Sequence, residues 1–99
     1  MSEEYPTDAE LEAITAWTPG PKWSGSEPWL GILQECSDAW NHDMGHALWD
    51  DDKKQMTFVT GGWSGNESVL SALHENFSAR AMLWLASFRG GKEIWGIKD

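Results

Sequence analysis

The chain has 99 residues, enough for one domain over residues 1–99 with a single modest core, and it carries a formal net charge of −9. This charge argues against direct binding of nucleic acid and against docking on anionic membranes, since both need lysine and arginine to meet phosphates. The single cysteine, Cys36, excludes a disulfide within the chain and indicates a reducing compartment. No signal peptide and no membrane-length apolar run is visible, so we expect a cytoplasmic protein.

Eight tryptophans stand out in so short a chain. Each ring can bury about 150–250 Å², so a few of them would dominate the core. One or two tryptophans left exposed would mark a surface for contact with another protein.

An acidic lead and a short helix open the chain. Residues 1–6 are polar and acidic. Thr7 and Glu10 have the spacing of a capping box, which predicts a helix over residues 8–17. A loop rich in proline, glycine and serine should then cover residues 18–27.

A second helix and a hairpin should follow. Apolar residues recur at steps of four, three and four, which is one helical face and predicts a helix over residues 28–40. These residues are Trp29, Leu33, Cys36 and Trp40. A short apolar run at residues 47–49 and an alternating run at residues 55–60 predict a β-hairpin with a charged turn between them.

The last third of the chain predicts a helix and a second hairpin. Apolar residues at helical spacing place the helix over residues 66–76. Residues 80–89 are nearly all apolar and could prolong this helix, since alanine, leucine and methionine favour helices. We expect a buried strand instead, because residues 89–92 resemble a hairpin turn and residues 93–97 alternate.

Taken together, the elements occur in the order helix, helix, strand, strand, helix, strand, strand. This order predicts a small α+β domain with a mostly antiparallel four-stranded sheet and helices on one face.

Residues 60–67, Thr-Gly-Gly-Trp-Ser-Gly-Asn-Glu, form the most informative motif. They join a predicted strand to a predicted helix, and Ser64 and Glu67 again have capping-box spacing. Because a helix N-terminus attracts anions, one hypothesis is a site for a nucleotide-like anion. Its candidate residues are Gly61, Gly62, Trp63, Ser64, Gly65, Asn66 and Arg89. The alternative, which the ordinary scaffolding role of such turns favours, is that the turn packs Trp63 into the core.

The same motif, followed by an apolar helix and a tryptophan-containing run that ends in Arg89, Gly90 and Gly91, resembles a family of small uncharacterised proteins of tailed bacteriophages and prophages. The opening at residues 6–11 is similar to the start of that family as well. The resemblance implies a viral accessory protein in the host bacterial cytoplasm, and it supplies no reaction.

Candidate metal ligands and catalytic groups are sparse. Cys36, His42 and His46 are weak candidates for zinc, but their spacing matches no recognised site and Gly45 disfavours a helix there. Ser64 lacks the flanking glycines of a nucleophile elbow, and no pair of carboxylates is distinguished. We therefore expect no metal, no cofactor and no catalytic residues, and a binding protein rather than an enzyme.

Two classes of function remain. The first is an inhibitor that presents acidic side chains and an aromatic anchor to the basic groove of a host nucleic-acid-binding protein, for example a defence protein. Its expected contacts are Asp50, Asp51, Asp52, Glu3, Glu4 and an exposed tryptophan such as Trp23. The second is a small-ligand binder that uses the glycine turn. A buried Trp63 and a continuous acidic face would favour the inhibitor, whereas an open pocket over the turn would favour the ligand binder.

A structural virion component is a third and weaker option. A homo-oligomer is compatible with all three.

Overall fold

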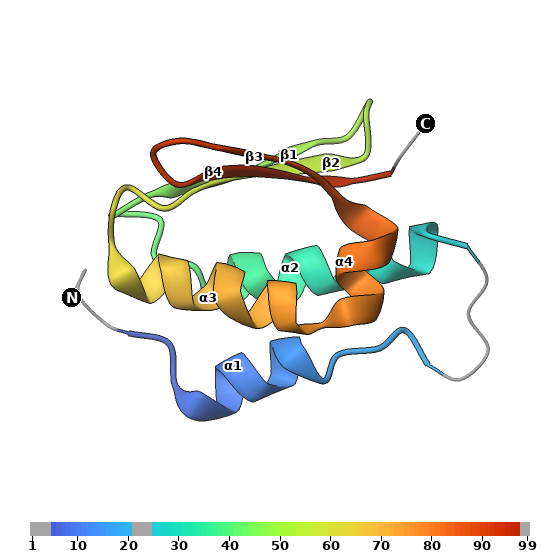
Figure 1. Ribbon diagram of the computed structural model, residues 1–99, viewed down its shortest axis with the longest axis horizontal. Helices are drawn as coiled ribbons and strands as arrows, with labels where there is room; N and C mark the ends of the chain where they lie inside the picture. The colour runs from blue at the N-terminus through green and yellow to red at the C-terminus, as the bar shows by residue number, and fades with distance from the viewer. Residues whose placement is uncertain (1–4, 21–24, 98–99) are drawn as a thin grey trace.

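A four-stranded antiparallel sheet, in the order β1-β2-β4-β3, lies against a layer of helices in the computed structural model (Figure 1). The structure describes residues 5–20 and 25–97. The elements are α1 (Asp8–Thr15), the 3₁₀ helix η1 (Glu27–Leu30), α2 (Gly31–Ala39), β1 (His46–Asp50), β2 (Gln55–Val59), α3 (Ser64–Glu75), α4 (Phe77–Leu83), β3 (Trp84–Phe88) and β4 (Lys92–Gly96). The predicted α+β class, element order and antiparallel sheet are confirmed.

Helices α2, α3 and α4 pack on one face of the sheet, and α1 lies outside them, on the side away from the sheet (Figure 1). None of the described helices is long and apolar enough to cross a bilayer.

The start of α1 follows the predicted capping box. The Thr7 hydroxyl accepts from the Glu10 N–H at 3.1 Å, and the Thr7 N–H donates to Glu10 Oε1 at 2.8 Å. The helix ends at Thr15, two residues before the predicted end. Ile14 is its buried residue and fixes the helix on the core.

The predicted capping box of α3 is wrong. Trp63 occupies the N-cap position in an extended conformation, Ser64 is already the first helical residue, and no side chain caps the helix. The reason lies in the preceding turn, where Gly61 and Gly62 both adopt positive φ values, of 67° and 77°. The hydroxyl that stabilises this turn belongs to Thr60, which accepts from the Gly62 N–H at 3.2 Å.

Residues 80–89 are helix in their first part and strand in their second, so the prediction of one strand over the whole segment is wrong. Asn76 ends α3, and its Oδ1 accepts from the Ala79 N–H at 3.1 Å, which caps a new helix, α4. This helix runs to Leu83, and β3 then begins at Trp84. The Asn76 cap therefore makes the first part of this segment helical, and the hairpin pattern applies only to the second part.

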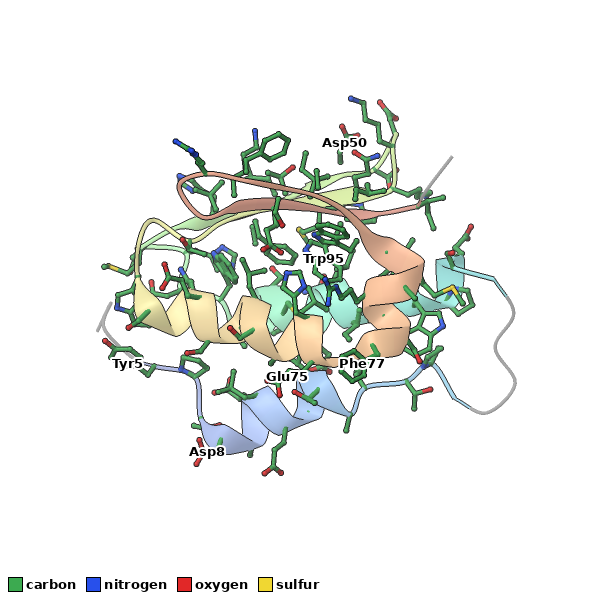
Figure 2. All side chains as sticks on the ribbon, in the orientation of Figure 1. Tyr5, Asp8, Asp50, Glu75, Phe77 and Trp95 are labelled. Carbon is green, nitrogen blue, oxygen red and sulfur yellow. The ribbon has the colours of Figure 1, made fainter. Side chains whose placement is uncertain are left out.

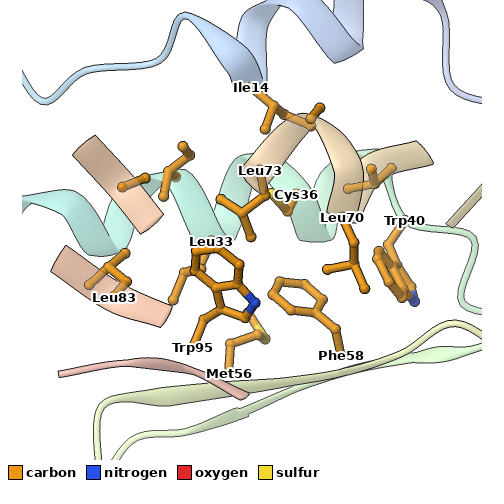
Figure 3. Close-up of a cluster of buried hydrophobic side chains, with 14 of the residues drawn as sticks. Ile14, Leu33, Cys36, Trp40, Met56, Phe58, Leu70, Leu73, Leu83 and Trp95 are labelled. Atoms are coloured by element: carbon orange, nitrogen blue, oxygen red, sulfur yellow. The ribbon is translucent and has the colours of Figure 1, made fainter. Parts of the chain in front are cut away.

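The core lies between the sheet and the helix layer (Figure 3). Alternate residues of the central strands point into it, namely Met56 and Phe58 of β2 and Trp95 of β4. Trp40 packs on Phe58 with ring centroids 5.0 Å apart. The buried tryptophans are Trp29, Trp40, Trp63 and Trp95.

Candidate functional site

The tryptophan of the glycine turn is buried. Trp63 is 8% exposed, and Tyr5 covers it with the ring centroids 4.7 Å apart. On its other side the ring lies so close to Gly65 that a Cβ there would come within 2.2 Å of it. Trp63 therefore offers no open stacking face, and Gly65 is required for close packing.

Asn66, the second polar residue of the candidate ligand site, is fully buried, with an exposed fraction of 0%. Its Oδ1 accepts from the Asn41 N–H at 2.9 Å, and its Nδ2 donates to Asn41 O at 3.1 Å and to Thr60 O at 3.4 Å. The amide thus joins the start of α3 to the segment that follows α2. Its hydrogen bonds are used inside the fold, which is a scaffolding role.

Arg89 was expected to complete the anion site. The β3–β4 turn does lie beside the glycine turn, since the Thr60 N–H donates to Gly91 O at 3.0 Å. Arg89 itself is exposed and makes no ion pair within residues 5–20 and 25–97. Four grooves on the described part of the surface are lined by residues outside the 61–66 segment.

The three candidate metal ligands occupy separate environments. Cys36 is buried in the core, where burial raises the pKa of its thiol far above the ordinary value. His42 Nε2 lies 3.0 Å from Ser37 O, and His46 is exposed at the start of β1. No group of three potential ligands comes together in the described part of the chain.

The acidic turn of the first hairpin is partly neutralised by its own residues. Asp50 Oδ1 accepts from the Lys53 N–H at 3.2 Å, and Asp51 pairs with Lys54 Nζ at 3.7 Å. Trp49, which is 42% exposed, directs its indole N–H toward Asp51 Oδ1 at 3.4 Å. The turn is thus a weaker acidic surface than its three consecutive aspartates suggest. The other predicted protein contacts, Glu3, Glu4 and Trp23, lie outside the described residues.

A groove that the sequence did not indicate runs beside α1 and the end of α2. It encloses about 370 Å³, and its carboxylates are Glu10, Asp38 and Asp43. Its remaining lining residues are Tyr5, Pro6, Thr7, Ala39, Trp40, Asn41 and His42. A second groove of about 230 Å³ shares Glu10, Asp38 and Ala39 with the first and adds Glu35. We call the two together the α1–α2 groove.

The polar groups of the α1–α2 groove suit a cationic guest. Four carboxylates line it, while lysine and arginine are missing from its described lining. Tyr5 is 60% exposed and offers an aromatic surface at one end. The Trp40 indole N–H is buried without a hydrogen-bond partner among the described residues. The site therefore combines negative charge with an aromatic ring, which is suitable for an arginine or lysine side chain of a partner.

Charge is distributed unevenly over the whole fold. A third groove, between α1 and α3, adds Asp8, Glu12 and Glu75 on the other side of α1. The described basic residues all lie elsewhere, on the two hairpins or on α4. They are Lys53, Lys54, Arg80, Arg89 and Lys92. The side of the molecule around α1 is thus an acidic face: carboxylates line grooves on both sides of this helix, and none of the described lysines and arginines lines them.

Sequence reasoning missed this face because its carboxylates are spread over three separate segments. The partial signal was the recurrence of acidic residues on the exposed sides of the first two predicted helices. Comparisons of the chain with protein-family models, with curated proteins and with solved structures gave no match.

Proposed function

We propose that this protein binds a basic surface of another protein through the α1–α2 groove. We further propose that the partner is a nucleic-acid-binding protein of a host bacterium, which is inhibited because its basic groove is covered. The observation that supports this is the gathering of carboxylates around α1, in a region whose described residues include no lysine or arginine.

The groove offers more than a diffuse negative charge. A guanidinium that enters it would come near the carboxylates of Glu10, Asp38 and Asp43, which all line the groove. Charge-assisted hydrogen bonds of this kind are roughly twice as strong as neutral ones. One inserted arginine, flanked by weaker contacts, is how many protein interfaces obtain most of their affinity.

The wider acidic face around α1 should raise the rate at which this protein and its partner meet. Complementary potentials steer partners together and are screened beyond about 10 Å at 0.1 M salt. A protein that binds nucleic acid presents the matching basic surface, because it must neutralise phosphates. Binding should therefore weaken as salt rises, and nucleic acid should compete for the partner.

Residence in a host bacterium rests on the resemblance of residues 60–67 and 89–91 to proteins of tailed bacteriophages. The fold adds a reason to prefer inhibition to ligand binding at the glycine turn. Trp63 is covered and the Asn66 amide is fully used, so the turn has no evident opening for a nucleotide.

The test is a pull-down of the tagged protein from host lysate at moderate salt, with stoichiometry read by mass spectrometry. Glu35→Lys/Asp38→Lys alters the groove, and Glu27→Lys/Glu67→Lys is the matched control, with the same change in net charge at exposed positions outside the groove. Asp51→Lys/Asp52→Lys is a separate variant that tests the hairpin turn. We expect a near-stoichiometric protein that is lost with the groove variant, retained with the control and released by nucleic acid. Loss with the hairpin variant alone would move the site to the turn. If the wild-type protein captures no partner, the proposal of inhibition is refuted for that host.

A further inference from the structure

The face of the sheet that points away from the helices is apolar at its centre. On β2 the buried residues Met56 and Phe58 point to the helices, so their neighbours along the strand point outward. The pairing register places residues of the other strands on the same side. We call this the outer sheet face; its apolar and weakly polar residues are Leu48, Thr57, Val59, Ala86, Phe88 and Ile94.

No described element covers this face (Figure 1). Leu48 is 60% exposed and Phe88 is 51% exposed, one on each edge strand. Along the strands of an antiparallel sheet, apolar residues on the buried face ordinarily alternate with polar residues on the solvated face. Leu48 and Ile94, which lie on either side of Thr57, do not follow that rule, and an apolar patch with polar ends is typical of a contact surface.

The charges at the two ends of the outer sheet face have opposite signs. The register pairs Gln55 with Gly96 and Val59 with Lys92, so the β1–β2 turn and the β3–β4 turn lie at opposite ends of the sheet (Figure 1). The first end carries three aspartates, at positions 50, 51 and 52, against Lys53 and Lys54. The second end carries Arg89 and Lys92, whose Nζ lies 5.2 Å from the centre of the Phe88 ring. Asp50 extends away from the helices in Figure 2.

We propose that a second copy of this chain covers the outer sheet face. The two sheets pack face to face about a two-fold axis that lies between them and runs across the strands. This axis places the acidic turn of each copy over the basic end of the other. A two-fold axis along the strands would instead place like ends together, so the charges select the first arrangement.

The distribution of charge also explains why a chain of net charge −9 can pair with itself. Helix α1, which carries Asp8, Glu10 and Glu12, lies on the far side of the helix layer from the sheet (Figure 1). Repulsion between them is screened over that distance at ordinary salt. The surfaces that meet carry balanced and complementary charge.

The area predicts a weak dimer. Four strands of five residues span roughly 19 Å by 17 Å, or about 320 Å² in projection on each copy. The projection alone is smaller than the area of about 600–1,000 Å² that each partner of a specific interface buries, and the relief of the side chains brings it at most to the lower end of that range. The dimer should therefore dissociate on dilution within the micromolar to millimolar range.

The test is sedimentation equilibrium of the full chain over that range, with circular dichroism to verify folding. Leu48→Glu inserts a charge midway along edge strand β1 of the outer sheet face and should weaken the dimer about tenfold or more. Phe77→Glu is the matched control, because Phe77 is 77% exposed on α4 and lies far from this face (Figure 2). It should leave the dimer intact.

Charge exchange tests the orientation. Arg89→Glu/Lys92→Glu and Asp51→Lys/Asp52→Lys should each weaken self-association, and a mixture of the two variants should pair again. Added salt should weaken the wild-type dimer, whereas the axis along the strands predicts that salt strengthens it. A chain that stays monomeric at every concentration overturns the proposal. So does a dimer that survives Leu48→Glu, which would pair through another surface. Neither result bears on the α1–α2 groove, which lies on other elements.

Discussion

His74 Nε2 of helix α3 lies 2.9 Å from Oε1 and 3.1 Å from Oε2 of Glu93 on strand β4. The same carboxylate accepts from the Trp95 indole N–H at 2.9 Å. The His74 ring also meets the rings of Trp84 and Trp95 edge-on, at centroid distances of 6.2 and 5.0 Å. One acidic side chain on the inner face of the sheet thus serves two donors, and it connects the helix layer to the central strands.

We predict that Glu93→Ala lowers the free energy of unfolding by about 1–3 kcal/mol, because the indole N–H of a fully buried ring loses its acceptor. Glu93→Gln should cost less, since its amide oxygen can still accept from Trp95. Urea denaturation followed by tryptophan fluorescence measures both, with the exposed Glu35→Ala as a control that should change little. Equal losses for the alanine and glutamine variants would show that the indole bond is not what matters.

Ser64 and Asn66, both candidates for the anion site, lie at the start of α3 and contribute differently to the stability of the fold. Asn66→Ala should destabilise the fold by about 2 kcal/mol or more, because a fully buried amide is lost together with its hydrogen bonds to the partly buried N–H and O of Asn41. Ser64→Ala should cost less than about 0.5 kcal/mol, since Ser64 caps nothing. Denaturation midpoints of the two variants decide the matter. A larger loss for Ser64→Ala would restore the capping box.

Gly61 and Gly62 provide a matched pair with the same backbone conformation and different surroundings. A Cβ on Gly62 meets nothing within 4 Å, so Gly62→Ala should cost only the strain of a positive φ, about 1–2 kcal/mol. A Cβ on Gly61 would lie 1.7 Å from Met44 O, so Gly61→Ala must also displace the backbone. Thermal unfolding should show a clearly larger drop for Gly61→Ala. Equal drops would contradict the close approach of residue 44.

Cys36 makes the stability sensitive to alkaline pH. Burial, and to a smaller degree the charge of Glu35, raises the pKa of the folded thiol above its ordinary value of 9.0. The folded chain keeps the proton while the unfolded chain loses it, so this stabilisation is complete below pH 9 and declines as pH rises above it. The expected slope is about 1.4 kcal/mol per pH unit. Cys36→Ala should remove that part of the slope in urea denaturation at pH 8 and pH 10. An unchanged slope would place the thiol in contact with water.

The features that the sequence predicted correctly are those decided by neighbouring residues. The Thr7–Glu10 capping box needs only four consecutive residues, and it formed as predicted. The register of β2 follows from alternation, with Met56 and Phe58 turned to the core. The α+β class follows from the order of such local units.

The features that the sequence missed depend on distant contacts or on backbone geometry. Ser64 failed as a cap because two successive positive-φ glycines moved the helix start by one residue. Asn76 began a new helix while its Nδ2 bonded to Ile14 O and Trp17 O, which are 62 and 59 residues away. The α1–α2 groove exists only because α1 packs beside α2, and no pattern within either helix predicts this contact.

The position of α1 as the outermost layer has a consequence for stoichiometry. A pair of copies joined through their sheets would carry its two α1–α2 grooves on opposite outer sides (Figure 1). Such a pair could bridge two target molecules, or two neighbouring subunits of one assembly. Once the first groove is filled, the second would sample its site at a high local concentration, so avidity could exceed the affinity of one groove by about 10²–10⁴. Dilution would then weaken inhibition more steeply than a single site allows.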